Sequence, residues 1–278
     1  MYEKILVPLD GSRLAELALP YAEEMAGKLG SEIILLSVAD SSVAREYHQH
    51  QIYVEKIITE TKHNAERYLE GSNRREVIVS TETVVGNPAE EIMNYAEQES
   101  VGLIIMVTHG ASGIRRWALG NIADKVLQAS RQPVALIRAK SPRDVCDRGI
   151  LDRLLVMLDG SAESEAVLPY VEELATGLSA EITLLQVVDE QIDTVFADAE
   201  GYLEKICQRL AEKGIGAHCE VRAGAPATEG IKLADEIEAD MVAMVTHGRS
   251  GAGFWKPGSV AEKVLKGGKT PVLLVRTR

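Results

Sequence analysis

The chain has 278 residues, of which 46% are apolar and 26% charged, and its formal net charge at pH 7 is −12. These proportions are typical of soluble globular domains, no apolar run approaches the roughly 18 residues of a membrane helix, and the acidic charge argues against nucleic acid and membranes as partners. The first residues pass directly into a strand-like run without a basic region and a long apolar segment, so we expect no secretory signal and a cytoplasmic location.

The first half alternates short apolar runs with helical patterns. The runs predict five strands, at 4–9, 32–38, 76–84, 103–107 and 134–138. Helical spacing predicts helices between them, at 14–29, 44–69, 89–99 and 121–129, of which 44–69 is the longest. Ser12 can cap the first helix, Gly30 ends it, and Pro88 suits the start of the third. The strand at 76–84 alternates apolar and polar residues, which is typical of a sheet edge.

The second half repeats this layout. Residues 153–161 match 4–12, and the pattern continues through the next strand before eleven residues are missing from the second helix region. The segment 139–152 has no helical or strand periodicity and contains Pro142 and Gly149. We therefore predict a first domain at 1–140, a linker at 141–152 and a second domain at 153–278. Strands that alternate with helices predict an α/β fold of two tandem, doubly wound, mostly parallel five-stranded sheets.

A glycine-rich loop follows the fourth strand of each half. Both copies begin Met-Val-Thr-His-Gly, have a second Gly three residues later, and reach a final Gly ten residues after the first, just before a helix. Glycines let backbone N–H groups approach a ligand closely, and a helix N-terminus attracts anions. The loops therefore predict phosphate-binding sites at the carboxyl ends of the strands, one in each half.

Linked motifs give the chain a resemblance to a known family. They are the opening Lys-Ile-Leu-Val-Pro-Leu-Asp-Gly-Ser, the Thr-His-Gly loop, the Gly-Ser pair before the last helix and the closing Pro-Val-Leu-Leu-Val strand. Together they resemble the universal stress protein family in a tandem, two-domain form, over nearly the whole chain. The resemblance implies Rossmann-like domains of the adenine nucleotide alpha hydrolase type. It also implies an adenine nucleotide site with an Asp after the first strand, which is Asp10 or Asp159, and a Val in the second, which is Val38 or Val187.

The predicted cofactor is ATP or a related adenine nucleotide, with or without Mg²⁺, and no residue is assigned to catalysis or to a metal. The predicted binding residues of the first half are Pro8, Asp10, Val38, Met106, Val107, Gly110, Gly113, Gly120, Asn121 and Ile122. Those of the second half are Asp159, Val187, Met244, Val245, Gly248, Gly251, Gly258, Ser259 and Val260.

The chain departs from the family's pattern at a few of these positions. The pattern is Gly, two residues, Gly, nine residues, then Gly and Ser or Thr, and its leading Gly is replaced by Val107 and by Val245. A branched Cβ at this position can fill room that Gly leaves for ribose or phosphate. Asn121 stands in place of Ser in the first half, and Met157 in place of the residue equivalent to Pro8 in the second. The second half is therefore expected to be the better phosphate binder.

Structural roles compete with these functional readings. Ser259 can cap its helix through a Ser-Val-Ala-Glu capping box, and the two Asp residues can stabilise turns. His109 and His247 have no motif-defined carboxylate or nucleophile beside them, which favours a role in stabilising the loop. The segment 267–270 (GGKT) lacks the first Gly of a P-loop and leads from helix to strand, so we reject that interpretation.

The hypotheses that remain differ in what the sites do. The first is a nucleotide-binding stress or signalling module, and the alternative is a scaffold that acts through protein interfaces with empty loops. If the protein has enzymatic activity, we expect no more than slow hydrolysis of ATP. The two halves are expected to pair with each other, whether or not the whole chain also forms a homodimer, and the sequence does not identify the protein partner. Cys146, Cys207 and Cys219 form no metal motif, and their odd number favours reduced thiols.

Overall fold

The computed structural model describes residues 1–39, 44–69, 76–108, 119–138, 149–188, 192–246 and 258–277, with the side chains of all but 44–46. The chain divides into two compact units, Met1–Ile150 and Leu151–Arg278. Most of the predicted linker, 141–148, lies outside the described residues.

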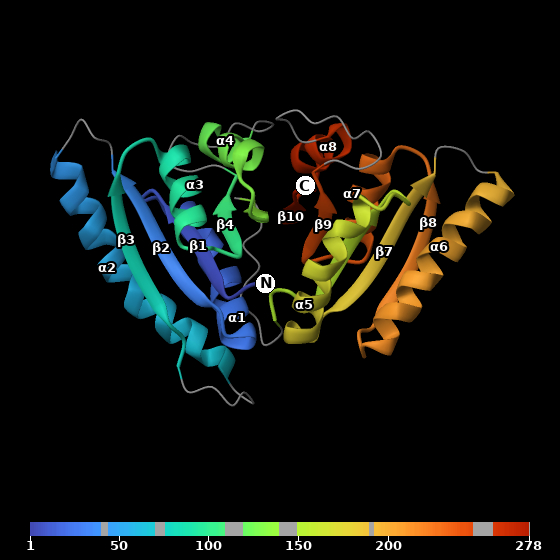
Figure 1. The fold of residues 1–278 in the computed structure, drawn as a ribbon, viewed down its shortest axis with the longest axis horizontal. Coiled ribbons are helices and arrows are strands. Elements are labelled where there is room, and N and C mark those ends of the chain that lie inside the picture. Colours follow the sequence, from blue (N-terminus) through green and yellow to red (C-terminus); the bar gives the residue numbers. More distant parts are fainter. Residues whose placement is uncertain are drawn as a thin grey trace. The chain divides into compact units, whose positions relative to one another are not determined.

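Unit 1 is a parallel sheet covered by helices (Figure 1). Its strands are β1 (Lys4–Leu9), β2 (Glu32–Ala39), β3 (Val79–Val85), β4 (Leu103–Val107) and β5 (Val134–Ile137). Its helices are η1 (Ala15–Ala18), α1 (Leu19–Leu29), α2 (Ala44–Glu66), η2 (Arg67–Leu69), α3 (Pro88–Gln98) and α4 (Asn121–Ala129). The strand order is β3-β2-β1-β4-β5, and the strand pairs of this unit are parallel.

Unit 2 repeats this layout. Its strands are β6 (Arg153–Leu158), β7 (Glu181–Val188), β8 (Ala217–Ala223), β9 (Met241–Val245) and β10 (Val272–Val275). Its helices are η3 (Ser164–Val167), α5 (Leu168–Leu178), α6 (Asp193–Glu212), α7 (Pro226–Glu236) and α8 (Ser259–Gly267). The order β8-β7-β6-β9-β10 matches that of unit 1, and its pairs are also parallel. The predicted doubly wound α/β fold is confirmed.

The order of the strands fixes where a ligand can bind. In unit 1 the chain builds outward from β1 to β3, then returns to the other side of β1 to form β4 and β5. The connections leave the carboxyl ends of β1 and β4 in opposite directions, which opens a crevice above this pair. The pair β6 and β9 forms the same switch point in unit 2.

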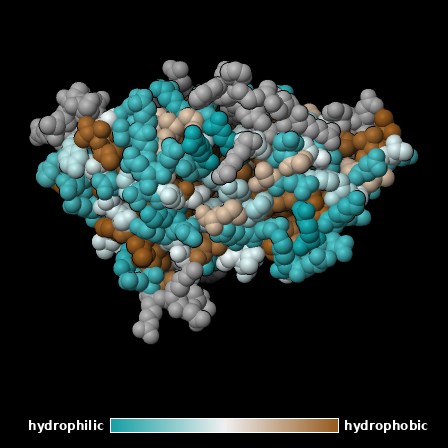
Figure 2. Space-filling model, in the orientation of Figure 1, coloured by the Kyte–Doolittle hydropathy of each residue, from teal (hydrophilic) through white to brown (hydrophobic). Residues whose placement is uncertain are grey.

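The apolar runs form the core of each unit because a parallel sheet between two helix layers is buried on both faces. All five residues of β4 and of β9 are buried, as are all four of β5 and of β10. The face drawn in Figure 2 is largely hydrophilic, with smaller hydrophobic patches. Charged residues on the surface and apolar strands in the interior together explain why the proportions of apolar and charged residues are typical of globular proteins.

The first predicted helix, 14–29, is wrong as a single element. The chain forms the 3-10 turn η1 and then begins α1 at Leu19, with Pro20 in its first turn. Pro20 has no backbone N–H to donate, so the α-helical hydrogen-bond pattern cannot run back from this position, although Ala18 and Leu19 keep helical φ and ψ. Ser12 still caps the segment, since its Oγ accepts from the N–H of Ala15 at 3.2 Å. Gly30 ends α1 in the left-handed region, as predicted.

The equivalent helix end in unit 2 carries Ser179 in the left-handed region, with φ of 59°. In this conformation a residue with a Cβ is strained by about 1 to 2 kcal/mol, and glycine is not. Glycine loses part of this advantage because its unfolded chain has a greater conformational entropy. We expect Ser179→Gly to raise the free energy of unfolding by roughly 0.5 to 1 kcal/mol, measured by urea denaturation. Gly30→Ser should lower it by a similar amount, and a loss of stability in Ser179→Gly would contradict this reading of the helix end.

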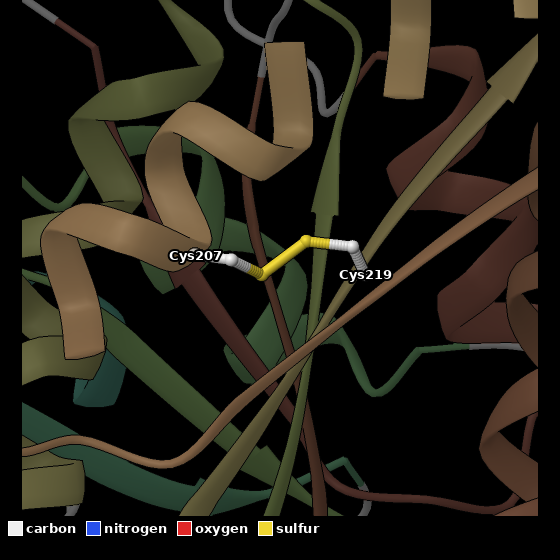
Figure 3. Close-up of a disulfide and its surroundings, with 2 residues drawn as sticks. All are labelled: Cys207 and Cys219. Atoms are coloured by element: carbon white, nitrogen blue, oxygen red, sulfur yellow. A yellow bond between two sulfur atoms is a disulfide. The ribbon is translucent and has the colours of Figure 1, made fainter. Parts of the chain in front are cut away.

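The cysteine expectation is wrong for two of the three thiols. Cys207 on α6 and Cys219 on β8 form a disulfide, with their Cα atoms 6.8 Å apart (Figure 3). The two residues are only 12 positions apart in sequence, but they belong to a helix and to the edge strand that follows it. The sequence gives no spacing signal for such a pair. Cys146 lies outside the described residues.

Candidate functional site

A cavity of about 840 Å³ lies at the carboxyl edge of the sheet in unit 2. It is bounded by the ends of β6, β7 and β9, by α6, and by the first turn of α8. Seven predicted binding residues line it: Asp159, Val187, Met244, Val245, Gly258, Ser259 and Val260. Its place beside the switch point is where open α/β sheets bind ligands, and its volume is in the range of small-molecule pockets.

Asp159 is the carboxylate at the end of β6. Its Oδ1 accepts hydrogen bonds from the backbone N–H of Ser161, at 3.0 Å, and from the Ser161 hydroxyl. In unit 1 the N–H and hydroxyl of Ser12 bond Asp10 in the same way, at 3.0 and 2.6 Å. The turn role proposed for these residues is therefore present. Asp159 also lines the cavity, so one carboxylate can serve the turn and a ligand.

The first turn of α8 also lines the cavity. The predicted capping box at 259–262 is wrong, because the N-cap is Gly258, one residue earlier, and no side chain caps this helix. The N–H of Gly258 donates to the carbonyl of Thr246 at 2.7 Å, which joins the two ends of the glycine loop. Residues 258–261 all line the cavity. The uncapped N–H groups of the first turn and the positive end of the helix dipole therefore suit an anion there.

Helix α6 supplies a wall of the cavity that the sequence did not predict. Ile192, just before this helix, and Val195, Ala199 and Tyr202 on it line the cavity, as does the polar Gln186 of β7. Burial raises the pKa of Tyr202 to about 12, and the nearby Glu165 acts in the same direction. Tyr202 is therefore a neutral phenol at physiological pH. The apolar wall suits a flat, uncharged group rather than a phosphate.

Unit 1 places the equivalent residues at the equivalent strand ends. Pro8, Val38, Met106 and Val107 belong to β1, β2 and β4, Asp10 follows β1, and Gly120, Asn121 and Ile122 begin α4. The N–H of Gly120 donates to the carbonyl of Thr108 at 2.7 Å, as at the other loop. Gly120 is the N-cap and has no side-chain cap. Asn121 is therefore the first residue inside its helix and does not cap it.

The described residues do not include the middle of either glycine loop. Gly110, Gly113, Gly248 and Gly251, together with His109 and His247, lie outside them. The two departures from the glycine pattern are described: Val107 and Val245 are 6% and 5% exposed at the ends of β4 and β9. Val245 lines the cavity, so its branched side chain forms part of the wall.

The described residues contain neither a metal-binding cluster nor a membrane-spanning helix. No group of three or more His, Cys, Asp or Glu there could hold a metal ion. Within the same residues, no helix combines the length and the apolar character that crossing a bilayer requires.

Comparison with known proteins gives the same family for both halves. The profile of the Universal stress protein family matches residues 1–138 and 151–276. The chain is 32% identical over 161 residues to a universal stress protein of Methanocaldococcus jannaschii, across 51% of this chain and 98% of that protein. It is also 32% identical over 148 residues to a universal stress protein of Bacillus subtilis, across 50% of this chain and all of that protein.

A solved structure has the tandem arrangement of the whole chain. The crystal structure of a universal stress protein from Archaeoglobus fulgidus is similar with a TM-score of 0.77. The match covers 99% of each chain at 23% sequence identity. The two proteins therefore share a fold of two consecutive Rossmann-like domains.

Proposed function

The chain belongs to the universal stress protein family, and from this premise we propose that it is a stress-response module that binds ATP or a related adenine nucleotide. The main site is the cavity of unit 2. A weaker site of the same kind lies at the equivalent strand ends of unit 1. Binding of the nucleotide regulates the protein's stability or its choice of partner, and chemical turnover is at most slow.

The observation that carries this proposal is that two chemically different surfaces line the unit 2 cavity. The apolar wall of α6 suits a purine base, while the uncapped first turn of α8 suits phosphate. Asp159 lies at the end of β6, where a carboxylate can accept hydrogen bonds from ribose hydroxyls. The base, the sugar and the phosphates of a nucleotide together match these three surfaces.

The donor set fits a nucleotide without a bound metal. The first turn of α8 offers backbone N–H groups, and the Ser259 hydroxyl adds a side-chain donor because it is not used as a cap. A bound nucleotide supplies the negative charge that this helix end stabilises. Mg²⁺, when present, would neutralise phosphate oxygens, and the chain's own contribution is to orient the phosphates.

Unit 1 differs where the phosphate would bind. Its helix begins with Asn121 in place of Ser259, so an amide replaces a hydroxyl at the first position inside the helix. A misplaced donor at a helix N-terminus should change affinity by about threefold to thirtyfold. We therefore propose that unit 2 is the tighter site.

Nucleotide analysis and a pair of glycine variants test the proposed function. Protein purified without added nucleotide and then denatured should release an adenine nucleotide. In calorimetric titrations with ATP, Gly258→Val should weaken the tighter binding event by at least about tenfold, because its side chain occupies the space where phosphate approaches the backbone. The backbone itself should tolerate the change, since φ at Gly258 is −55°, a region open to any residue.

Gly120→Val is the matched control, at the equivalent helix start with φ of −61°. It should affect only the weaker event. Loss of the tighter event in Gly120→Val alone would reverse the assignment of the two sites. Binding that neither variant changes would exclude the glycine loops as the nucleotide site, and no binding at all would favour the scaffold, in which Val107 and Val245 close the sites.

A further inference from the structure

Gly230 of α7 lies directly against the end of the Met157 side chain of β6. A Cβ atom placed on Gly230 would lie 2.5 Å from Cε and 2.7 Å from Sδ of Met157. Atoms of real side chains do not approach so closely, so the thioether occupies a notch, the space left by the missing side chain of Gly230. Met157 is 7% exposed and lines the unit 2 cavity. The notch therefore holds the end of a side chain that belongs to the cavity wall.

Unit 1 fills the equivalent space in a different way. Pro8 and Met157 are each the fifth residue of their strands, β1 and β6. Ile92 and Gly230 are each the fifth residue of a helix that begins with proline, α3 and α7. Unit 1 thus combines a short, rigid ring on the strand with a large side chain on the helix, and Ile92 is 2% exposed. Unit 2 combines a long, flexible side chain with none, which keeps the core filled from the strand instead of the helix.

The cavity lies close to this notch. Pro226, the first residue of α7, lines the cavity, and Gly230 lies about one turn further along the same helix. Strand β6 lies between β7 and β9, so Met157 has a strand on each side and α7 against its end. Protein interiors are close-packed, and the free space that the described residues leave beside Met157 is the cavity that it lines. A thioether displaced from the notch would therefore enter the cavity.

We propose that Met157 is a movable part of the wall of the unit 2 site and that Gly230 is a positioning residue, which keeps the thioether clear of the ligand. This inference rests on the proposed function, and it concerns the room that the site leaves for an adenine nucleotide. Methionine is unbranched and has three rotatable bonds, and its sulfur makes favourable contacts with aromatic rings such as a purine. Its side chain can therefore adjust to a bound ligand. Pro8, at the same place in unit 1, has a fixed ring and cannot.

Calorimetric titrations of ATP into the full chain test the role of the notch. In Gly230→Ala the new methyl group displaces the end of Met157, so the tighter binding event should weaken about fivefold to hundredfold. Truncation of Met157 removes the clash, so the double variant with Gly230→Ala and Met157→Ala should bind ATP within about threefold of the unaltered protein. The matched control is Gly201→Ala on α6, where no described atom lies within 4 Å of the added methyl group. It should bind ATP as the unaltered protein does.

A spectroscopic measurement follows the Met157 side chain directly. The chain has 7 methionines, and in protein labelled with ¹³C at their methyl groups the Met157 signal is the one missing from Met157→Leu. In the ligand-free protein this signal should move in Gly230→Ala and stay in place in Gly201→Ala. It should also move when ATP binds to the unaltered protein. If Gly230→Ala does not fold, this response to ATP carries the test, and a signal that ATP leaves in place would count against a movable wall.

The possible results separate this inference from the proposed function. Unchanged ATP affinity in Gly230→Ala would overturn the inference and leave the proposed function standing. A loss of affinity that truncation of Met157 does not recover would also overturn it, because the added methyl group would then act through α7 itself and not through the thioether. Absence of ATP binding in the unaltered protein would remove both.

Discussion

Replacing Glu23 with Gln should stabilise the protein by on the order of 2 to 3 kcal/mol near pH 8 and by almost nothing below pH 4.5. Glu23 lies on α1 and is 5% exposed. Burial is the main cause that raises its pKa from 4.5 to about 7, and Glu60 adds to the rise. Asn64, Arg67 and Thr61 favour the charged form but do not compensate.

The direction of the pH dependence follows from this raised pKa. The carboxyl group binds its proton more tightly in the folded protein, so its contribution to stability is fully present below the unfolded pKa of 4.5 and is lost as the pH rises through about 7. Glutamine cannot ionise, and it keeps an oxygen in the position that accepts from Asn64 at 3.3 Å. The variant therefore escapes the cost of a buried charge at high pH.

Urea denaturation near pH 4.5 and pH 8 measures the effect. The matched control is Glu172→Gln, at the equivalent position of α5, where the carboxylate is paired with Lys213 and its side chain is 18% exposed. That variant should gain no stability at pH 8. A Glu23→Gln gain of the same size at both pH values would show that packing, and not titration, is responsible.

The repeated patterns made most of the fold predictable. Buried parallel strands appear as continuous apolar runs, so β4 was predicted at its observed bounds, Leu103–Val107, from five consecutive apolar residues. Gly30 was a reliable helix end because it provides a left-handed conformation without cost. The strand predicted at 76–84 begins later, at Val79, because a strand begins only where a neighbour pairs with it, and β2 starts this pairing at Ile33.

The features that the sequence did not predict depend on contacts between distant residues. Pro20 lies inside the helix predicted at 14–29, and the backbone geometry shows that the α-helix begins only at Leu19. Gly258, and not Ser259, is the N-cap, and its N–H donates to the carbonyl of Thr246, a residue distant in sequence. Gln186 carried a usable signal, a long polar side chain in a buried strand. It lines the unit 2 cavity together with Ala199, which lies on the next helix.

The sequence motifs made the two sites look more alike than they are in the structure. Motif residues such as Asp10 and Asp159 repeat with the same hydrogen bonds to the following serine. The differences lie between the motifs, where Ser37 and His50 of one unit are replaced by Gln186 and Ala199 of the other. A tandem protein can in this way keep the same turns at its strand ends while the side chains between the motifs differ from one unit to the other.

The disulfide should have the second large effect. For a bond that closes a loop between residues 12 positions apart, the constraint on the unfolded chain is worth about 3 kcal/mol. Cys219→Ser should therefore lower the free energy of unfolding of the oxidised protein by about that amount. Cys219 is exposed on β8, so serine leaves little cavity behind. With reductant present, the variant and the unaltered protein should unfold at nearly the same urea concentration.

Counting thiols makes this prediction independent of the stability measurement. Three cysteines and one disulfide leave a single thiol, Cys146, to react when the oxidised protein is denatured without reductant, and three after reduction. Cys207→Ser should lose as much stability as Cys219→Ser, and the double variant no more than either, because all three remove one bond. Three reactive thiols in protein purified under air would show that the bond does not form. Because cytoplasmic thiols are normally kept reduced, the stability of the reduced protein is then the value that applies at the location expected from the sequence.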